Sequence, residues 1–187
     1  AYFERFGEGI WHHGDLATLV ADSGGVIIHG RSDATLNPGG IRIGTAELYS
    51  VFLDRPPLKY FIQDALVTVE LIRAASGASD ERIVAFVVRR EGRTPSVQVG
   101  GSEEPQGLLN LIQREVRNQL SPRHVPAKIW FVRDVPYTFS GKRVEIAVKK
   151  LLAGQPVPNR GALRNPQALD SIERITGTVR TQHRNAL

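Results

Sequence analysis

The stretch IVAFVV, from Ile83 to Val88, is the clearest structural signal in this chain of 187 residues. A continuous apolar run rich in β-branched residues is typical of a strand that is buried on both faces. Further along, the stretch from Gly107 to Leu120 carries an apolar residue at every fourth position, which predicts an amphipathic helix. A buried strand followed by such a helix indicates a sheet with at least one helix packed on it.

Other apolar stretches predict further strands from Ile62 to Ile72 and from Lys128 to Val132. Gly24-Gly25 predicts a hairpin turn before a short strand from Val26 to Ile28. Small and polar residues predict two loops, Ala74 to Asp80 and Glu91 to Pro105.

Three more helices are predicted. The first has Thr45 as its N-cap, with Glu47 in its first turn, and ends at Arg55-Pro56-Pro57. The second follows Lys142, and the third begins at Asn165-Pro166, ends at Gly177 and is followed by ten frayed residues. Their apolar faces consist of Val144, Val148, Leu151 and Leu152 in the second, and Leu169, Ile172 and Ile175 in the third. Strands and helices follow one another irregularly, which predicts an α+β domain, one small sheet with helices packed on it.

Composition narrows the class of protein. The absence of cysteine excludes disulfides, thiolate metal sites and a cysteine nucleophile. The chain lacks methionine and starts at Ala1, so we expect it to be a piece of a longer protein. It has neither an apolar run of membrane-spanning length nor a signal peptide at its start, so we expect no membrane partner and a cytoplasmic location.

The net charge of +5 is concentrated in the segment that starts at Gly154, where the arginines are scattered. Nucleic-acid binding favours basic residues clustered on one surface. We therefore expect no nucleic-acid partner.

The stretch WHHGD, from Trp11 to Asp15, holds the first candidate functional residue. A carboxylate can accept two hydrogen bonds from a vicinal diol such as a ribose, although Gly-Asp is also ordinary turn chemistry. Adjacent histidines point to opposite faces of an extended chain, and no further ligands are spaced near His12 and His13. No metal site is predicted.

The stretch GRSDATLNPGGIRIGTAELY, from Gly30 to Tyr49, combines two arginines with paired glycines. Arg31 and Arg42 can each make bidentate contacts to phosphate or ribose oxygens. Gly39-Gly40 permits positive φ angles or the close approach of a ligand to the main chain. The alternative is a hairpin with solvated arginines.

The stretch PYTFSGK, from Pro136 to Lys142, places a lysine at the start of a predicted helix. Lys142 is a point charge suited to phosphate or carboxylate oxygens, and Gly141 lets its loop move. The glycine spacing excludes a P-loop. The alternative is a solvated surface lysine.

Taken in this order, the three stretches resemble the motifs of the adenylate-forming enzymes, the acyl-CoA synthetase and luciferase superfamily. The resemblance covers about Trp11 to Ile175. Within the superfamily the motif sequences are most similar to those of the acetoacetyl-CoA synthetases. Four stretches carry this finer resemblance: WHHGD, GRSDATLNPGG (Gly30 to Gly40), PRHVPAKI (Pro122 to Ile129) and the tail GQPVPN followed by NPQAL.

The resemblance implies roles for individual residues. Asp15 and Arg31 match positions that hold the ribose of ATP or AMP, and Arg42 matches an arginine near the phosphates. Lys142 matches the catalytic lysine that bridges the substrate carboxylate and the α-phosphate, where it stabilises developing charge.

The resemblance also implies a domain that moves between two half-reactions. Asp33 matches the hinge, and Gly39 and Gly40 match the glycines that line the path of CoA. The implied division has three parts: 1–32, the end of a large N-terminal adenylation domain; 33–153, the mobile C-terminal domain; 154–187, a helical C-terminal extension.

The implied reaction consumes ATP, with Mg²⁺, to convert acetoacetate to an acyl-adenylate, from which CoA displaces AMP. The implied N-terminal domain, absent from this chain, would be its main partner and would hold most of the substrates. We expect the chain alone to be inactive. Two alternatives stay open: another short-chain acyl-CoA synthetase, acting on acetate or propionate, and a non-catalytic basic interaction module.

Overall fold

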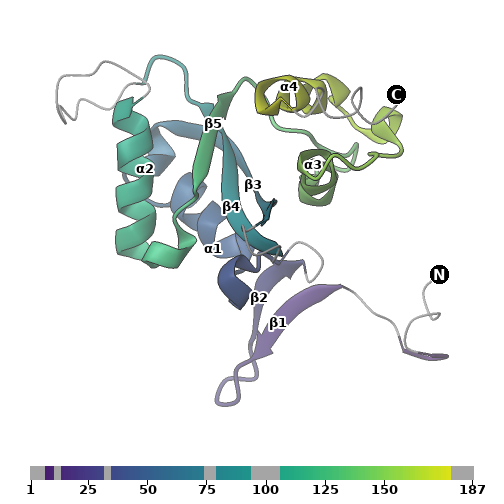
Figure 1. The fold of residues 1–187 in the computed structure, drawn as a ribbon. Coiled ribbons are helices and arrows are strands. Elements are labelled where there is room, and N and C mark those ends of the chain that lie inside the picture. Colours follow the sequence, from purple (N-terminus) through teal and green to yellow (C-terminus); the bar gives the residue numbers. More distant parts are fainter. Residues whose placement is uncertain (1–6, 11–13, 32–34, 74–78, 94–105, 178–187) are drawn as a thin grey trace.

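The computed structural model describes residues 7–10, 14–31, 35–73, 79–93 and 106–177 (Figure 1). At its N-terminal side, β1 (Asp15–Leu19) and β2 (Val26–Arg31) form an antiparallel two-stranded sheet. The turn between them is closed by the Val20 N–H, which donates to the Gly25 carbonyl at 2.8 Å, and this confirms the predicted hairpin turn. The second strand is longer than predicted because its pairing with β1 continues to Arg31.

The predicted strand from Ile83 lies at the centre of a three-stranded sheet of order β3-β4-β5. The strands are β3 (Ile62–Arg73), β4 (Ser79–Arg89) and β5 (Lys128–Val132). β3 pairs with β4 antiparallel and β5 pairs with β4 parallel. The loop predicted up to Asp80 is too long, because Ser79 and Asp80 already pair with β3. Backbone pairing continues there although the side chains are polar and exposed.

Helices cover both faces of this sheet, as Figure 1 shows. One face packs against α1 (Thr45–Tyr49) and α2 (Gln106–Gln119), and the other against α3 (Glu145–Leu152) and α4 (Pro166–Thr176). Successive residues of β4 alternate between the two cores, so both faces of the IVAFVV strand are buried. The predicted α+β class is confirmed. Among the described residues, no helix has the length and apolarity needed to span a membrane.

The first helix begins differently from the prediction. Gly44 occupies the N-cap position in an extended conformation, whereas Thr45 is already helical and is buried. A wide helical turn, Ser50–Asp54, continues α1 until the chain becomes extended at Arg55, as predicted. The remaining short turns are 3-10 helices at Pro38–Gly40, Leu58–Tyr60, Pro122–His124 and Arg160–Ala162.

The last helix starts and ends where the sequence predicts. Asn165 is at the N-cap position, and Gly177 ends the helix with a φ of 73°. The predicted apolar face is partly wrong, because Ile175 is 46% exposed while Ile172 is buried. Val144 is the N-cap residue of α3 and still packs in the core below α3 and α4.

Some predictions lie outside the described residues: the His12-His13 pair, the hinge at Asp33, most of the loop from Glu91 to Pro105, and the frayed last ten residues. The boundaries proposed after residues 32 and 153 stay predictions.

Candidate functional site

Lys142 ends a tight turn that starts at Thr138. The Thr138 N–H donates to the Lys142 carbonyl at 2.9 Å, and the Lys142 N–H donates to Thr138 Oγ1 at 3.1 Å. Gly141 has a φ of 78°, a conformation that favours glycine. The Lys142 side chain is exposed, and its ammonium has no hydrogen-bond or ion-pair partner within the described part of the chain. We call residues 138–142 the lysine turn.

Residues 159–165, which we call the C-terminal segment, contact the start of the lysine turn. Tyr137 pairs with Arg143, and Thr138 pairs with Leu163, both as antiparallel bridges. The Arg164 N–H donates to the Tyr137 carbonyl at 2.8 Å. Three consecutive backbone contacts therefore fix the start of the turn.

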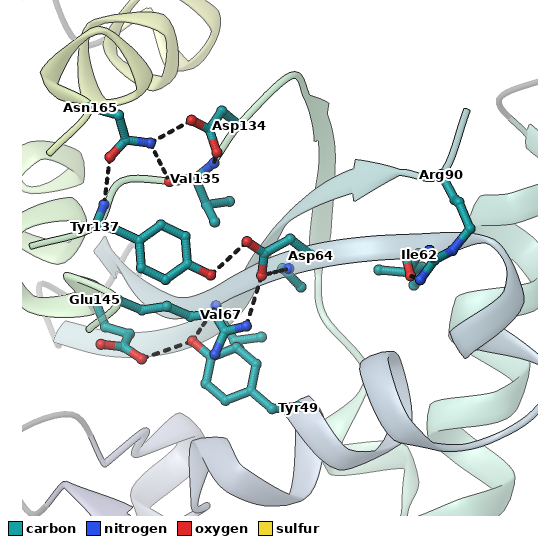
Figure 2. Close-up of polar contacts among 12 residues, drawn as sticks. Tyr49, Ile62, Asp64, Val67, Arg90, Asp134, Val135, Tyr137, Glu145 and Asn165 are labelled. Carbon is teal, nitrogen blue, oxygen red and sulfur yellow. Dashed lines mark hydrogen bonds and ion pairs between the residues drawn. The ribbon is translucent and has the colours of Figure 1, made fainter. Parts of the chain in front are cut away.

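Asn165 adds side-chain contacts to the same entrance, shown in Figure 2. The buried amide accepts a hydrogen bond from the Tyr137 N–H at 2.8 Å and donates one to the Val135 carbonyl at 2.9 Å. It also donates to the Asp134 carboxylate. The Asn165 side chain makes no capping hydrogen bond to α4. Its amide therefore binds this loop rather than the helix that it precedes.

Asp64 supports the lysine turn from the sheet. Its Oδ2 accepts a hydrogen bond from the Tyr137 hydroxyl at 2.6 Å (Figure 2), and its Oδ1 accepts one from Arg143 at 2.7 Å. The register of β3 against β4 shifts between Ile62 and Asp64. Such bulges change the direction of side chains, and this one lies next to Asp64, whose carboxylate supports the lysine turn.

The tyrosines of this network are held in their neutral form. Burial and the hydrogen bond to Asp64 raise the pKa of Tyr137 to about 12. Burial and the nearby charge of Glu145 raise the pKa of Tyr49 well above its usual value. The Tyr49 hydroxyl donates to Glu145 at 2.9 Å and accepts from the Val67 N–H at 3.1 Å, so it connects α3 to the sheet (Figure 2).

Gly39 and Gly40 form the tip of a second turn, closed by reciprocal backbone hydrogen bonds between Leu36 and Ile43 at 3.0 and 2.9 Å. Their φ angles are 57° and 78°, and both residues are exposed. A Cβ added at either glycine would meet nothing within 4 Å. The glycines are therefore explained by their backbone conformation, and the tip leaves open space for a molecule outside the chain.

Acidic residues of β4 anchor this glycine turn. The Gly39 N–H donates to Asp80 Oδ1 at 3.0 Å, and the Asn37 N–H donates to Glu81 Oε2 at 3.1 Å. The other oxygen of Glu81 is 2.7 Å from the ammonium of Lys149 in α3. The glycine turn is therefore attached both to the sheet and, through Glu81, to the helix that follows the lysine turn.

The structure brings two of the predicted site residues together. Asp15, at the start of β1, and Lys142 line one open cavity of 840 Å³, together with Asn159 and Leu163 from the C-terminal segment. Arg31 lies opposite Asp15 in the β1–β2 pairing, but its side chain is outside the described part.

The other predicted residues lie elsewhere. Arg42 is exposed beside the glycine turn and is not among the residues that line the cavity, and the same holds for Gly39 and Gly40. Asp33 lies outside the described residues. The predicted site is therefore divided into a cavity with Asp15 and Lys142 and a separate glycine turn with Arg42 next to it.

The sequence prediction missed the polar support of the lysine turn. Asp64 had a detectable signal, since a carboxylate in an apolar strand needs a partner. Its partners Tyr137 and Arg143 come from distant segments of the chain. The other residues of this support are also far apart in the sequence: Tyr49, Glu145 and Asn165.

Known proteins resemble this chain over nearly its whole length. Two curated acetoacetyl-CoA synthetases each match over 170 residues, 91% of this chain: that of Caenorhabditis elegans at 44% identity and that of Rhizobium meliloti at 46%. The solved structure of acetoacetyl-CoA synthetase from Streptomyces lividans matches 94% of the chain with a TM-score of 0.70 and 35% identity. The chain is similar to part of the acetoacetyl-CoA synthetases.

The matched region covers only part of each relative. It amounts to 22% and 23% of the two curated acetoacetyl-CoA synthetases and 24% of the S. lividans structure, so the chain spans about a quarter of their length. No protein-family model matches the chain. The predicted resemblance of the sequence to the acetoacetyl-CoA synthetases is confirmed by these matches.

Proposed function

We propose that this chain is the C-terminal part of an ATP-dependent acetoacetate–CoA ligase, which joins acetoacetate to CoA and releases AMP and pyrophosphate through an acetoacetyl-adenylate. The observation that carries the proposal is the shared cavity of Asp15 and Lys142. A ribose-binding carboxylate and a free ammonium beside the same space suit a nucleotide whose α-phosphate is attacked by a carboxylate. Acetoacetate is proposed as the acyl substrate because the similar proteins are acetoacetyl-CoA synthetases.

In the first half-reaction, the acetoacetate carboxylate attacks the α-phosphate of ATP, and pyrophosphate leaves. We assign to Lys142 the stabilisation of the negative charge that develops between these groups, because its ammonium is exposed and unpaired among the described residues. Asp15 and Arg31 are assigned to the ribose and Arg42 to the phosphates. These assignments rest on the family motifs and on the position of Asp15 in the cavity.

In the second half-reaction, the CoA thiol attacks the acyl carbon of the adenylate and AMP leaves. We assign Gly39 and Gly40 to the passage of CoA, since their exposed tip carries no side chain. A change of domain orientation between the two halves would explain why Lys142 and the glycine turn lie at separate places. Asp33 as its hinge stays a prediction.

Magnesium is proposed to bind mainly through the rest of the protein. The described residues contain no group of three or more His, Cys, Asp or Glu side chains placed to hold a metal ion. The remaining three-quarters of the protein is proposed to supply most contacts to ATP and acetoacetate, and the chain alone is expected to be inactive. A cytoplasmic location also stays a prediction.

The test uses the full-length protein. Acetoacetate-dependent exchange of pyrophosphate into ATP reports on the first half-reaction, and conversion of preformed acetoacetyl-adenylate to acetoacetyl-CoA reports on the second. We expect Lys142→Ala to lower the exchange rate about 10²- to 10³-fold, because it removes one charge that stabilises the transition state, and to spare the second half. Lys59→Ala, which removes a lysine of the Leu58–Tyr60 3-10 helix outside the three motif stretches, is the control.

Two outcomes would reject parts of the proposal. Faster exchange with acetate or propionate than with acetoacetate would reject the substrate and favour another short-chain synthetase. Unchanged exchange in Lys142→Ala would reject the site. Salt-sensitive binding of nucleic acid by the unmodified chain, together with absence of exchange in the full-length protein, would favour the basic interaction module.

A further inference from the structure

We propose that Arg143 is a positioning residue that fixes the place of Lys142 during adenylate formation. The inference rests on the proposed function, because it concerns the lysine assigned to that step. Arg143 follows Lys142 directly and pairs with Tyr137 across the base of the lysine turn. Neighbouring residues of an extended chain point to opposite sides. Lys142 is accordingly exposed, while the Arg143 side chain is only 26% exposed.

Aromatic rings lie on the path of the Arg143 side chain. Its guanidinium carbon lies 4.6 Å from the ring centre of Tyr49 and 5.7 Å from that of Tyr137. A guanidinium is planar and stacks on aromatic faces, whereas an ammonium does not. The two rings come from α1 and from the entrance of the turn, so Arg143 connects the turn to the body of the domain.

A single carboxylate then holds both ends of the turn. Asp64 accepts one hydrogen bond from Arg143, just after the turn, and another from Tyr137, just before it, at 2.7 and 2.6 Å. Asp64 belongs to β3, which pairs with the central strand β4. Two charge-assisted hydrogen bonds therefore fix the base of the lysine turn relative to the sheet. Such hydrogen bonds are stronger and more directional than neutral ones.

The state of the Arg143 side chain supports a fixed position. Among the described residues, its Nε is the one buried side-chain nitrogen or oxygen that has no hydrogen-bond partner. A buried donor without a partner is unfavourable, so the side chain is held there by its stacking and by Asp64. Burial opposes the charge of Arg143, but the hydrogen bond to Asp64 raises its pKa, so it stays a cation.

Arg143 and Lys142 differ in whether their positive charge has a partner. Both residues line the cavity, but the charge of Arg143 is compensated by Asp64, whereas that of Lys142 has no partner in the described part of the chain. Lys142 is thus the cation available to substrate. Arg143 acts through Lys142 by setting where that cation stands.

The experiment measures both half-reactions in the full-length protein for Arg143→Ala, Lys142→Ala and the double variant. We expect Arg143→Ala to lower the kcat of pyrophosphate exchange about tenfold to a hundredfold, the range that a small misplacement of a catalytic group produces. The KM for ATP and the second half-reaction should be unchanged. In the Lys142→Ala background, Arg143→Ala should cause no further loss, because the group that it positions is already gone.

Two conservative variants and one control complete the design. Arg143→Lys keeps the charge but loses the planar contact, and Asp64→Asn keeps the shape but loses the charge; both should lower exchange as Arg143→Ala does. Arg82→Ala removes an arginine that also binds a carboxylate, Glu70, at 2.7 Å but lies in β4 away from the turn. It should exchange pyrophosphate at the normal rate.

Several results would overturn the inference. Normal exchange in Arg143→Ala would show that the turn needs no such support. A further loss in the double variant would show that Arg143 contacts substrate itself. Equal loss in both half-reactions would show a general folding defect, which Asp64→Asn would reproduce. Unchanged exchange in Lys142→Ala alone would instead reject the proposed function, and the inference would fall with it.

Discussion

Asp15, the first residue of β1, and Lys142, the last residue of the lysine turn, line the same cavity although they come from distant parts of the chain. The cavity is lined both by the start of the β1–β2 hairpin and by the segment before α3. Under the proposed function, substitutions in this cavity should separate nucleotide binding from charge stabilisation.

Replacing Asp15 by Asn should weaken nucleotide binding more than it slows the chemical step. Under the proposed function this change removes the charged acceptor for the ribose hydroxyls, and hydrogen bonds to charged groups contribute about 1.5–3 kcal/mol. Steady-state exchange assays of the full-length protein should show a KM for ATP raised about tenfold or more. Asp22→Asn, in the exposed hairpin turn, is the control. A normal KM for ATP in Asp15→Asn would remove Asp15 from the site.

Replacing Tyr137 by Phe should change how stability depends on alkaline pH. Because the folded-state pKa of about 12 lies above the ordinary value of 10.0, the folded state retains a proton that the unfolded state releases. The stabilisation is complete below pH 10 and is lost as the pH rises toward 12. Urea unfolding at increasing pH should show a steeper decline for the original chain than for Tyr137→Phe. Parallel curves would contradict the raised pKa.

Replacing Asn165 by Ala should destabilise the chain by about 1–3 kcal/mol, since the Tyr137 N–H and the Val135 carbonyl lose their partner. Asn165→Asp should be worse at neutral pH, because it places a second carboxylate beside Asp134. Lowering the pH should reduce the difference between the two variants. Urea unfolding at two pH values measures both effects, and equal stability of Asn165→Ala and the original chain would show that the amide is dispensable.

Replacing Gly40 by Ala should impair the second half-reaction beyond its effect on stability. The φ of 78° costs a side chain about 1–2 kcal/mol, but the space around it is empty. Gly154→Ala has a similar backbone, with a φ of 67° and open surroundings, and lies in the C-terminal connector. Both variants should lower the unfolding free energy alike, and only Gly40→Ala should slow thioester formation. Identical thioester rates would argue against CoA passing this turn.

The sequence pattern predicted the main strands and helices, because the spacing of apolar residues reflects which faces are buried. The continuous apolar run of β4 and the four-residue spacing of α2 each record which faces are buried, and both faces are covered as expected. The functional motifs placed Asp15 and Lys142 but gave no distance between them. Their approach depends on how the hairpin and the C-terminal segment pack, which no local pattern records.

Where prediction failed, a tertiary contact replaced a local rule. Asn before Pro usually caps a helix, yet the amide of Asn165 binds Val135 and the entrance of the lysine turn instead. Thr45 suits an N-cap, but it is buried as the first helical residue and Gly44 takes the cap position. The partners of Asp64 could not be foreseen, because Tyr137 and Arg143 lie beside it only in the folded chain.

Glu81 has a consequence for how this body would move. One of its oxygens accepts a hydrogen bond from the Asn37 N–H in the glycine turn, and the other binds Lys149 in the helix that follows Lys142. Glu81 thereby links the glycine turn to α3. Under the proposed function, a rotation of this body would carry the glycine turn and the lysine turn together, so that one displacement would serve both half-reactions.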